Sequence, residues 1–374
     1  MAKRRKGEGA RRHETSLEHK RIAGDVAEMR RVAETTFYTL TPQMAVNAAL
    51  NIEGGLLHAQ GIKSLIEDYH EGAGRGHWFG DRWGLIIAAG PSISRFKHLE
   101  TLAEFYEGRK FTIIAVDAAL PALLDLEVYP DYVVSTDPQE ATSQFYADVE
   151  ERREGLHKAG TMAVLPGTVN PKVIKMWPLP RKSFYWPASP FGKRLEASQL
   201  WDLMAPLGIV NVHGHVTGAC LTIANALGLQ GAAIIGGDYS YEAGTTYEES
   251  FWYKWMVELG KPHEEILDNL KPEQFQDPWT GEAVWTDVVF LQYIGYITNW
   301  LASLKTPWQL INCSQRGLLH EPTLIKSAKF RTWLEALDGQ GDKRPGEGGD
   351  GGRAGQGAPD TAPPEAPDGA VQGL

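Results

Sequence analysis

Three aspartates in this sequence stand where a binding site would need them. Asp117, Asp137 and Asp238 each follow a short apolar run. Such runs predict buried strands, and the carboxyl ends of parallel strands meet at one edge of a sheet, where ligands bind. Carboxylates at that edge can hold Mg²⁺, bind ribose hydroxyls or accept a proton. A single Asp there is better explained as a helix cap or turn residue, but three in equivalent positions favour a site.

The first predicted strand ends in the turn Gly90-Pro91-Ser92. Glycine permits close backbone approach, proline fixes φ, and serine can accept from free backbone N–H groups. A strand, a glycine turn and a helix start are the common geometry for holding a phosphate. The turn lacks the GxGxxG and GK[ST] signatures, so a phosphate site and a plain strand-to-helix turn both remain open.

A second polar segment, His213-Gly-His215-Val-Thr217-Gly218, precedes a predicted helix. Thr217 and Gly218 can cap that helix and present free N–H groups to an anion. The two histidines could ligate a metal, but no third ligand has convincing spacing. We therefore expect one of them to line the cleft and the other to be an ordinary surface residue.

Alternating strands and helices must position these residues. Strands are expected at Leu85–Ala89, Thr112–Val116, Tyr132–Ser135, Met162–Leu165, Phe184–Trp186, Ala232–Gly236 and Gln309–Asn312. Helices are expected at Leu99–Tyr106, Ala119–Leu126, Glu140–Arg153, Leu195–Met204, Val216–Leu227, Tyr247–Leu259 and Thr286–Leu304. Near-continuous apolar strands with helices between them predict a Rossmann-like α/β fold with a mostly parallel, doubly wound sheet.

The two ends of the chain differ from this central part. Residues 1–76 form a basic arm and a helical extension, in which Thr41-Pro42 is expected to start a helix. Residues 77–337 are the expected nucleotide-binding core. Residues 338–374 are rich in Gly, Pro, Asp and Glu, and we expect a disordered acidic tail there.

Composition narrows the function classes. The net charge of −10 argues against nucleic acid as the main partner of the core. The two cysteines, Cys220 and Cys313, lie far apart, which favours a reducing compartment over a disulfide framework. No apolar run reaches the roughly 18 residues of a membrane span, and the basic N-terminus lacks the apolar segment of a secretion signal. We therefore expect a cytoplasmic protein.

Several of these segments together resemble the MptE-like family, which includes archaeal 6-hydroxymethylpterin diphosphokinases and the bacterial motility-associated factors that glycosylate flagellin. The likeness lies in Ile87-Ala-Ala-Gly-Pro-Ser-Ile93, Val116-Asp-Ala-Ala-Leu120, Val128–Asp137, Gly218–Gly228, Ile234-Ile-Gly-Gly-Asp-Tyr239 and Gln309–Gly317. It spans roughly residues 83–320. A more distant likeness is to the bacterial sialyltransferases that use CMP-sialic acid.

The resemblance implies roles for the residues already singled out. Gly90, Pro91 and Ser92 would contact the phosphates of a nucleotide, as would Thr217 and Gly218. Asp117, Asp137 and Pro138 would line the pocket for the base or ribose, and Asp238 would lie at the reaction centre. Asp137 and Asp238 are then the expected catalytic pair and the expected ligands of Mg²⁺.

Three functions are open as alternatives, of which the first two follow from the resemblance. The first is transfer of diphosphate from ATP to a hydroxymethyl group. The second is transfer of a sialic-type sugar from a CMP-linked donor to a small-molecule or glycan acceptor, in which carboxylates matter less as metal ligands. The third is a binding or assembly protein that uses the fold without catalysis, since fold alone does not determine function.

Overall fold

The computed structural model describes residues 26–73, 82–188, 205–242, 248, 251–258, 260–305 and 308–339. The expected helix at Leu195–Met204, the basic arm at 1–21 and all but the first two residues of the expected tail lie outside these ranges. No helix in the described parts of the chain combines the length and apolar character needed to cross a bilayer.

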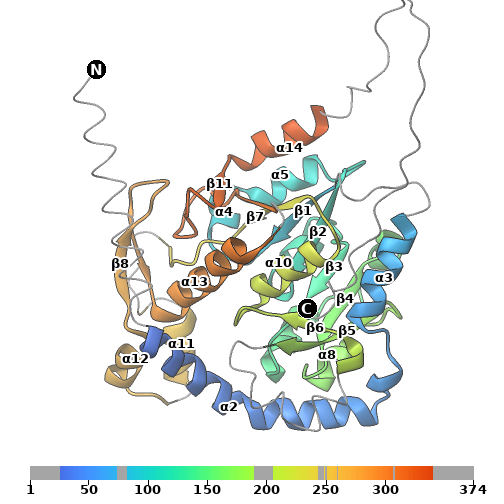
Figure 1. Cartoon of the computed structure of the whole chain (residues 1–374), viewed down its shortest axis with the longest axis horizontal. Coiled ribbons are helices and arrows are strands. Elements are labelled where there is room, and N and C mark those ends of the chain that lie inside the picture. The colour runs from blue at the N-terminus through green and yellow to red at the C-terminus, as the bar shows by residue number, and fades with distance from the viewer. Residues whose placement is uncertain are drawn as a thin grey trace, which may run out of the picture.

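A nine-stranded sheet forms the centre of the molecule (Figure 1). Its strands, in chain order, are β1 (Trp83–Ile87), β2 (Phe111–Val116), β3 (Tyr132–Val134), β4 (Met162–Pro166), β5 (Lys182–Ala188), β6 (Ile209–Asn211), β7 (Gly231–Ile235), β10 (Gln309–Asn312) and β11 (Ile325–Ser327). Every neighbouring pair is parallel, with Ile86 of β1 opposite Ile114 on one side and Ile234 on the other. The Rossmann-like α/β fold expected from the sequence is confirmed.

Strand order locates the ligand-binding edge. The order across the sheet is β11-β10-β7-β1-β2-β3-β4-β5-β6. The chain therefore proceeds from β1 to β6 in one direction and then returns to the other side of β1. In open sheets of this kind ligands bind beyond the carboxyl ends of the strands where the order reverses. That point lies between β1 and β7.

Helices pack on both sides of the sheet and build two apolar clusters. The larger cluster includes residues of β1 to β7 and of β10 and β11, and the smaller one includes the alternate residues of β3, β4 and β5. The helices are α2 (Val26–Glu53), α3 (Ile62–Ala73), α4 (Ser92–Arg95), α5 (His98–Glu104), α6 (Leu120–Asp125), α7 (Arg153–Ala159), α8 (Pro171–Met176), α10 (Val216–Ala226), α11 (Phe251–Glu258), α12 (His263–Leu270), α13 (Val288–Ser303) and α14 (Phe330–Gly339). Short 3₁₀ turns are η1 (Leu56–His58), η3 (Asp117–Ala119), η4 (Glu140–Tyr146) and η6 (Ala205–Leu207), and a hairpin of β8 (Glu273–Gln276) and β9 (Ala283–Thr286) precedes α13.

The expected helix start at Thr41-Pro42 is wrong, because α2 runs through Pro42 without a break. Pro42 lies on the exposed side of the helix, where water can satisfy the carbonyl that loses its partner. The expected helix at Glu140–Arg153 is also wrong, since η4 ends at Tyr146 and α7 begins only at Arg153. Strands β6 and β11 and the β8–β9 hairpin are too short or too polar for the apolar pattern to have indicated them.

Candidate functional site

The turn after β1 lies directly against the end of β7. The amide of Gly90 donates to the carbonyl oxygen of Gly236 over 2.9 Å. A Cβ at position 90 would lie 2.4 Å from that oxygen and 2.7 Å from Oδ2 of Asp238. Only glycine fits this approach, so the Gly-Pro-Ser turn and the Gly-Gly-Asp segment form one structural unit at the point where the strand order reverses.

Asp238 is the acidic residue at this point, and its side chain is buried at 1% exposure. Its Oδ2 accepts a hydrogen bond from the amide of Ser92 over 2.7 Å, whereas Oδ1 has no hydrogen-bond partner among the described residues. Burial raises the pKa of Asp238 to about 6, against the opposing effects of hydrogen bonding from Ser92 and, after it, of the positive charge on Arg316. The amide of Ser92, which the sequence suggested as a phosphate ligand, therefore donates to the carboxylate of Asp238 instead.

Asp117 lies at the end of the neighbouring strand β2 and is also buried. Its carboxylate accepts hydrogen bonds from the hydroxyl of Ser135 and the amide of Ala118. The same hydroxyl lies 3.0 Å from the phenol of Tyr146. Burial, and secondarily the nearby charge of Asp137, raises the pKa of Asp117 to about 7. Asp117 is thus fixed by a buried hydrogen-bond network and lies near enough to Asp137 for that charge to affect its pKa.

Asp137 follows β3 and is partly exposed. Its Oδ1 accepts from the amide of Gln139 over 2.8 Å, which fixes the turn, and burial raises its pKa. The next residue, Pro138, is buried and accepts a hydrogen bond at its carbonyl from Nδ2 of Asn47 on α2, over 2.8 Å.

Helix α2 fastens two loops at this edge of the sheet through two buried asparagines. Nδ2 of Asn47 also donates to the carbonyl of Thr168, and Nδ2 of Asn51 donates to the carbonyls of Gly167 and Val169, over 2.9–3.1 Å. The loop after β3 and the loop after β4 are therefore tied to one helix. Sequence analysis missed both asparagines; the one available signal was a pair of amides four residues apart in an otherwise apolar segment.

His215 caps the start of α10, and both of its ring nitrogens are engaged. Nδ1 lies 3.1 Å from the carbonyl oxygen of His213 and so carries the proton, while Nε2 accepts from the phenol of Tyr239 over 2.8 Å. The ring stacks on Tyr293 of α13 with centroids 4.3 Å apart. Burial lowers the pKa of His215 to about 3, so the ring is neutral at physiological pH.

The other members of this segment lie close by. His213 is buried too, with Nε2 3.2 Å from the hydroxyl of Thr222, and burial lowers its pKa to about 4. The expectation of one ordinary surface histidine is therefore wrong.

Thr217 is buried in the first turn of α10, and a Cβ at Gly218 would lie 2.6 Å from the carbonyl oxygen of Val212. The pKa of the Tyr293 phenol is raised mainly by burial and also by the charges of Asp287 and Asp137. Tyr239 and Tyr293, absent from the predicted set, thus border the same edge.

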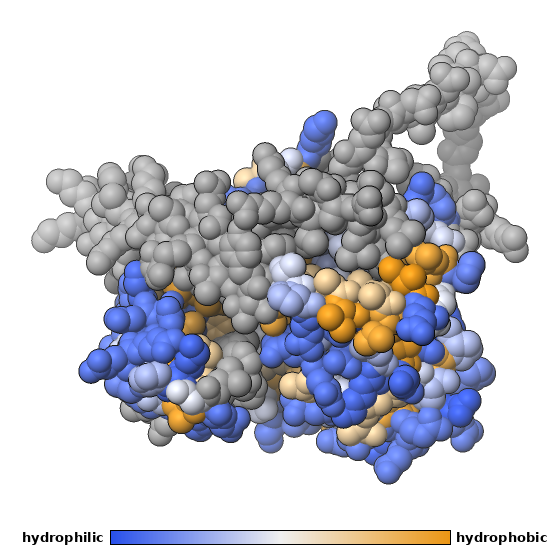
Figure 2. Space-filling view, turned by 90° about the horizontal axis from the view of Figure 1, so that it is seen from below, coloured by the Kyte–Doolittle hydropathy of each residue, from blue (hydrophilic) through white to orange (hydrophobic). Residues whose placement is uncertain are grey.

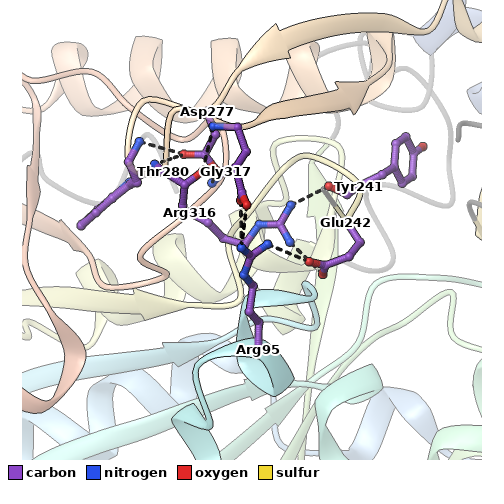
Figure 3. A network of polar contacts seen from close by, with 9 residues as sticks. Arg95, Tyr241, Glu242, Asp277, Thr280, Arg316 and Gly317 are labelled. Atoms are coloured by element: carbon purple, nitrogen blue, oxygen red, sulfur yellow. Dashed lines mark hydrogen bonds and ion pairs between the residues drawn. The ribbon is translucent and has the colours of Figure 1, made fainter. Parts of the chain in front are cut away.

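An ionic network joins the hairpin to this edge (Figure 3). Arg316, only 1% exposed, contacts Oε2 of Glu242 at 2.8 Å and donates to the carbonyl of Tyr241 over 2.6 Å. Arg95 of α4 contacts the same Glu242 at 3.1 Å and Glu282 of the hairpin at 2.9 Å. The segments after β1, β7 and β10 and the β8–β9 hairpin are therefore linked by two arginines and two glutamates.

A single Mg²⁺ shared by Asp137 and Asp238 does not fit this arrangement. The two residues follow β3 and β7, which are three strand spacings apart, or about 14 Å. No three acidic, histidine or cysteine side chains gather into a metal site within the ranges described. Mg²⁺ commonly uses one or two carboxylates together with substrate phosphates. The partly exposed Asp137, with Asp117 nearby, fits that arrangement better than the pair does.

Comparison with known proteins adds family evidence. The model of one protein family, described as 6-hydroxymethylpterin diphosphokinase MptE-like, matches residues 58–244, and every predicted site residue lies within that range. Among solved structures, the MAf glycosyltransferase from Magnetospirillum magneticum AMB-1 is 18% identical, with a TM-score of 0.47, over 70% of this chain and 37% of that one. This chain thus spans little more than a third of that protein's length. None of the curated proteins compared with the chain matches it.

Proposed function

This chain belongs to the MptE-like family, and on that premise we propose that it is a nucleotide-dependent transferase. The group would move from a nucleotide bound at the reversal of the strand order to a hydroxyl of a second substrate. The observation that carries the proposal is the convergence of Gly90, Ser92 and Asp238 between β1 and β7, inside the range that the family model matches.

Asp238 is the proposed general base. Its pKa of about 6 leaves it mostly ionised at pH 7 yet able to accept a proton, which is the range that suits a base working near neutrality. Oδ2 is held by the amide of Ser92, and we assign Oδ1, which is buried and has no hydrogen-bond partner among the described residues, to the acceptor hydroxyl. A fixed carboxylate with one committed and one free oxygen can orient a hydroxyl while it removes the proton.

Diphosphate transfer from ATP is the concrete form we propose first, because it agrees with the family description. The acceptor, a hydroxymethyl group of the pterin class, would give its proton to Asp238. Its oxygen would form a bond to the β-phosphorus, the bond from that phosphorus to the oxygen bridging the α-phosphate would break, and AMP would leave. Asp137 and the phosphate oxygens would hold Mg²⁺, whose charge would offset that of the transferred group.

Transfer of a sialic-type sugar from a CMP-linked donor is the second candidate. The observation that favours it is the wide separation of Asp137 and Asp238, since this reaction does not need a metal held between two carboxylates. The same base would serve, because here too an acceptor hydroxyl must lose its proton. The acceptor oxygen would bond to the anomeric carbon and CMP would leave.

Calorimetric titration of the full chain with ATP and with CMP, each with and without Mg²⁺, separates the candidates. ATP binding that requires Mg²⁺ supports diphosphate transfer, and CMP binding indifferent to Mg²⁺ supports sugar transfer. A folded chain that binds neither nucleotide would overturn the proposal and favour a non-catalytic role.

The variant Asp238→Asn tests the base. The amide oxygen can still accept from Ser92, so we expect nucleotide binding within a few-fold of wild type and turnover lowered by about 10²-fold or more. Asp148→Asn, at an exposed carboxylate two residues after the end of η4, is the matched control and should leave both unchanged. Wild-type turnover in Asp238→Asn would remove this residue from the mechanism.

A further inference from the structure

Over residues 40–53, helix α2 turns two asparagines inward, beside the buried Ala48, and exposes two large apolar side chains to solvent. Val46 and Leu50 are 59% and 49% exposed, whereas Asn47 and Asn51 are each 4% exposed. A surface helix of a globular protein ordinarily shows the reverse pattern, with the apolar stripe against the core. We expect a partner to cover this apolar stripe, which consists of Ala45, Val46, Ala49 and Leu50.

The rotation of α2 about its axis is fixed, so this exposure is a property of the fold. Four hydrogen bonds from Asn47 and Asn51 to backbone carbonyls hold the inward side. Ala45 and Ala49 are exposed beside Val46 and Leu50. Figure 2, seen from below, shows apolar surface on the underside, where α2 lies in Figure 1.

The sequence of this helix also departs from that of a solvated surface. Residues 35–52 contain no Asp, Glu, Lys or Arg, although 22% of the whole chain is charged and about four such residues would be expected in a segment of that length. Helices that lie on membranes carry Lys or Arg along their polar side. Here the polar side is buried and bears asparagines, which argues against a lipid surface as the partner.

We propose that this stripe is the contact surface for a second copy of the chain, with the two α2 helices packed antiparallel about a two-fold axis. The stripe has a row of small residues, Ala45 and Ala49, next to a row of large ones, Val46 and Leu50. Across a two-fold axis the large row of one helix faces the small row of the other, so the surface is complementary to itself. An uncharged contact also suits two copies that each carry a net charge of −10.

The size of the stripe sets the expected strength. Over the helical residues from Pro42 to Glu53 it is about 18 Å long, and a strip of that length is on the order of 200 Å². A standard stable interface buries about 800 Å² on each partner. The α2 contact by itself therefore predicts a reversible dimer of micromolar or weaker affinity, populated at high protein concentration.

Analytical ultracentrifugation of the full chain from about 5 to 200 µM tests the proposal over the range that such an affinity requires. We expect the weight-average mass of wild type to rise toward that of a dimer, and Val46→Glu/Leu50→Glu to remain a monomer throughout. The control is Val257→Glu on α11, where the wild-type side chain is as exposed as Leu50, at 49%, and it should behave as wild type. A wild-type monomer at the highest concentration, or equal loss of dimer in the control, would overturn the proposal.

A cysteine variant tests the geometry even if the charged variants fail to fold. Both native cysteines are buried, so Ala49→Cys introduces the accessible thiol of the described chain. A short bis-maleimide should link two copies of Ala49→Cys at least ten times faster than two copies of Val257→Cys. Equal rates would place the contact elsewhere. Flotation of wild type with anionic vesicles, together with a monomeric mass, would instead identify the stripe as a membrane surface and refute the dimer.

Discussion

The asparagines of α2 offer the sharpest test of how the candidate site is held together. Asn47 donates to the carbonyls of Pro138 and Thr168, and Asn51 donates to those of Gly167 and Val169. The two side chains are equally buried and each makes two hydrogen bonds. They differ in one respect, because Asn47 alone reaches the loop that carries Asp137.

The cost of each substitution can be worked from these contacts. A buried hydrogen bond contributes about 0.5–1.5 kcal/mol net, and a carbonyl left buried without a partner adds a desolvation penalty. Asn47→Ala and Asn51→Ala should therefore each lower the free energy of unfolding by about 2–4 kcal/mol. Urea unfolding of the full chain measures this loss, and values below about 0.5 kcal/mol for both variants would show that the hydrogen bonds do not hold α2.

Asn47→Ala and Asn51→Ala should differ in their effect on the candidate site. In Asn47→Ala the turn at 137–139 loses its tether, so the amide of Gln139, which donates to Asp137, should exchange with solvent faster than in Asn51→Ala. Nucleotide affinity should fall several-fold more in Asn47→Ala for the same reason. Equal exchange rates and equal affinities in the two variants would refute the idea that α2 positions Asp137.

Three further predictions concern stability and are measured by urea unfolding of the full chain. Gly90→Ala should destabilise the protein by about 1–3 kcal/mol, because the added Cβ would overlap the backbone at the end of β7. Gly295→Ala, in open space within α13, should stabilise it by about 0.5–1 kcal/mol. A change of the same sign in both variants would contradict this reasoning. Burial lowers the pKa of His98 to about 4, so its imidazole takes up a proton near pH 6.5 in the unfolded chain but not in the folded chain. The free energy of unfolding should therefore fall by about 3 kcal/mol from pH 7 to pH 4 because of this residue. His98→Leu should remove this contribution to the pH dependence. Arg316→Met should cost about 3 kcal/mol, because it removes a buried guanidinium that pairs with Glu242 and donates to the carbonyl of Tyr241. Arg331→Met, at an ion pair exposed on both sides, should cost clearly less, and a reversed order would show that the hairpin is held by other contacts.

The sequence predicted the sheet well because the information needed was local. Buried parallel strands are short apolar runs, and the seven expected strands match β1, β2, β3, β4, β5, β7 and β10 within one or two residues at most ends. The sequence signal for the start of α13 is equally local, because the side chain of Asp287 caps the helix by accepting from the amides of Val289 and Phe290. The strand ends, and with them the edge of the sheet that carries the three aspartates, could therefore be predicted.

The partners of the site residues could not be predicted, because they are distant in the chain. The carboxylate of Asp238 accepts from Ser92, 146 residues earlier, and the Asn47 amide donates to a carbonyl 91 residues later. No pattern within a helix or strand specifies such pairs. Strand order is likewise a tertiary property, and it is what separates Asp137 from Asp238 by three strand spacings. Local sequence identified the candidate site residues. Their roles depend on distances between strands and loops that local sequence does not specify.

The division between a helical extension and a core follows sequence composition, whereas the contacts cross it. Leu56, Ile62 and Leu65 are buried in the two apolar clusters of the sheet, and the backbone at Gly61 forms an isolated parallel bridge with Phe184 of β5. A chain that began at residue 77 would lose these side chains together with four hydrogen bonds from α2 to the loops of the candidate site. We therefore expect such a fragment to expose apolar surface and to lose the fixed position of Asp137. Ligand binding should be measured on the full chain, because failure of the fragment to bind would reflect the missing helices rather than the chemistry of the site.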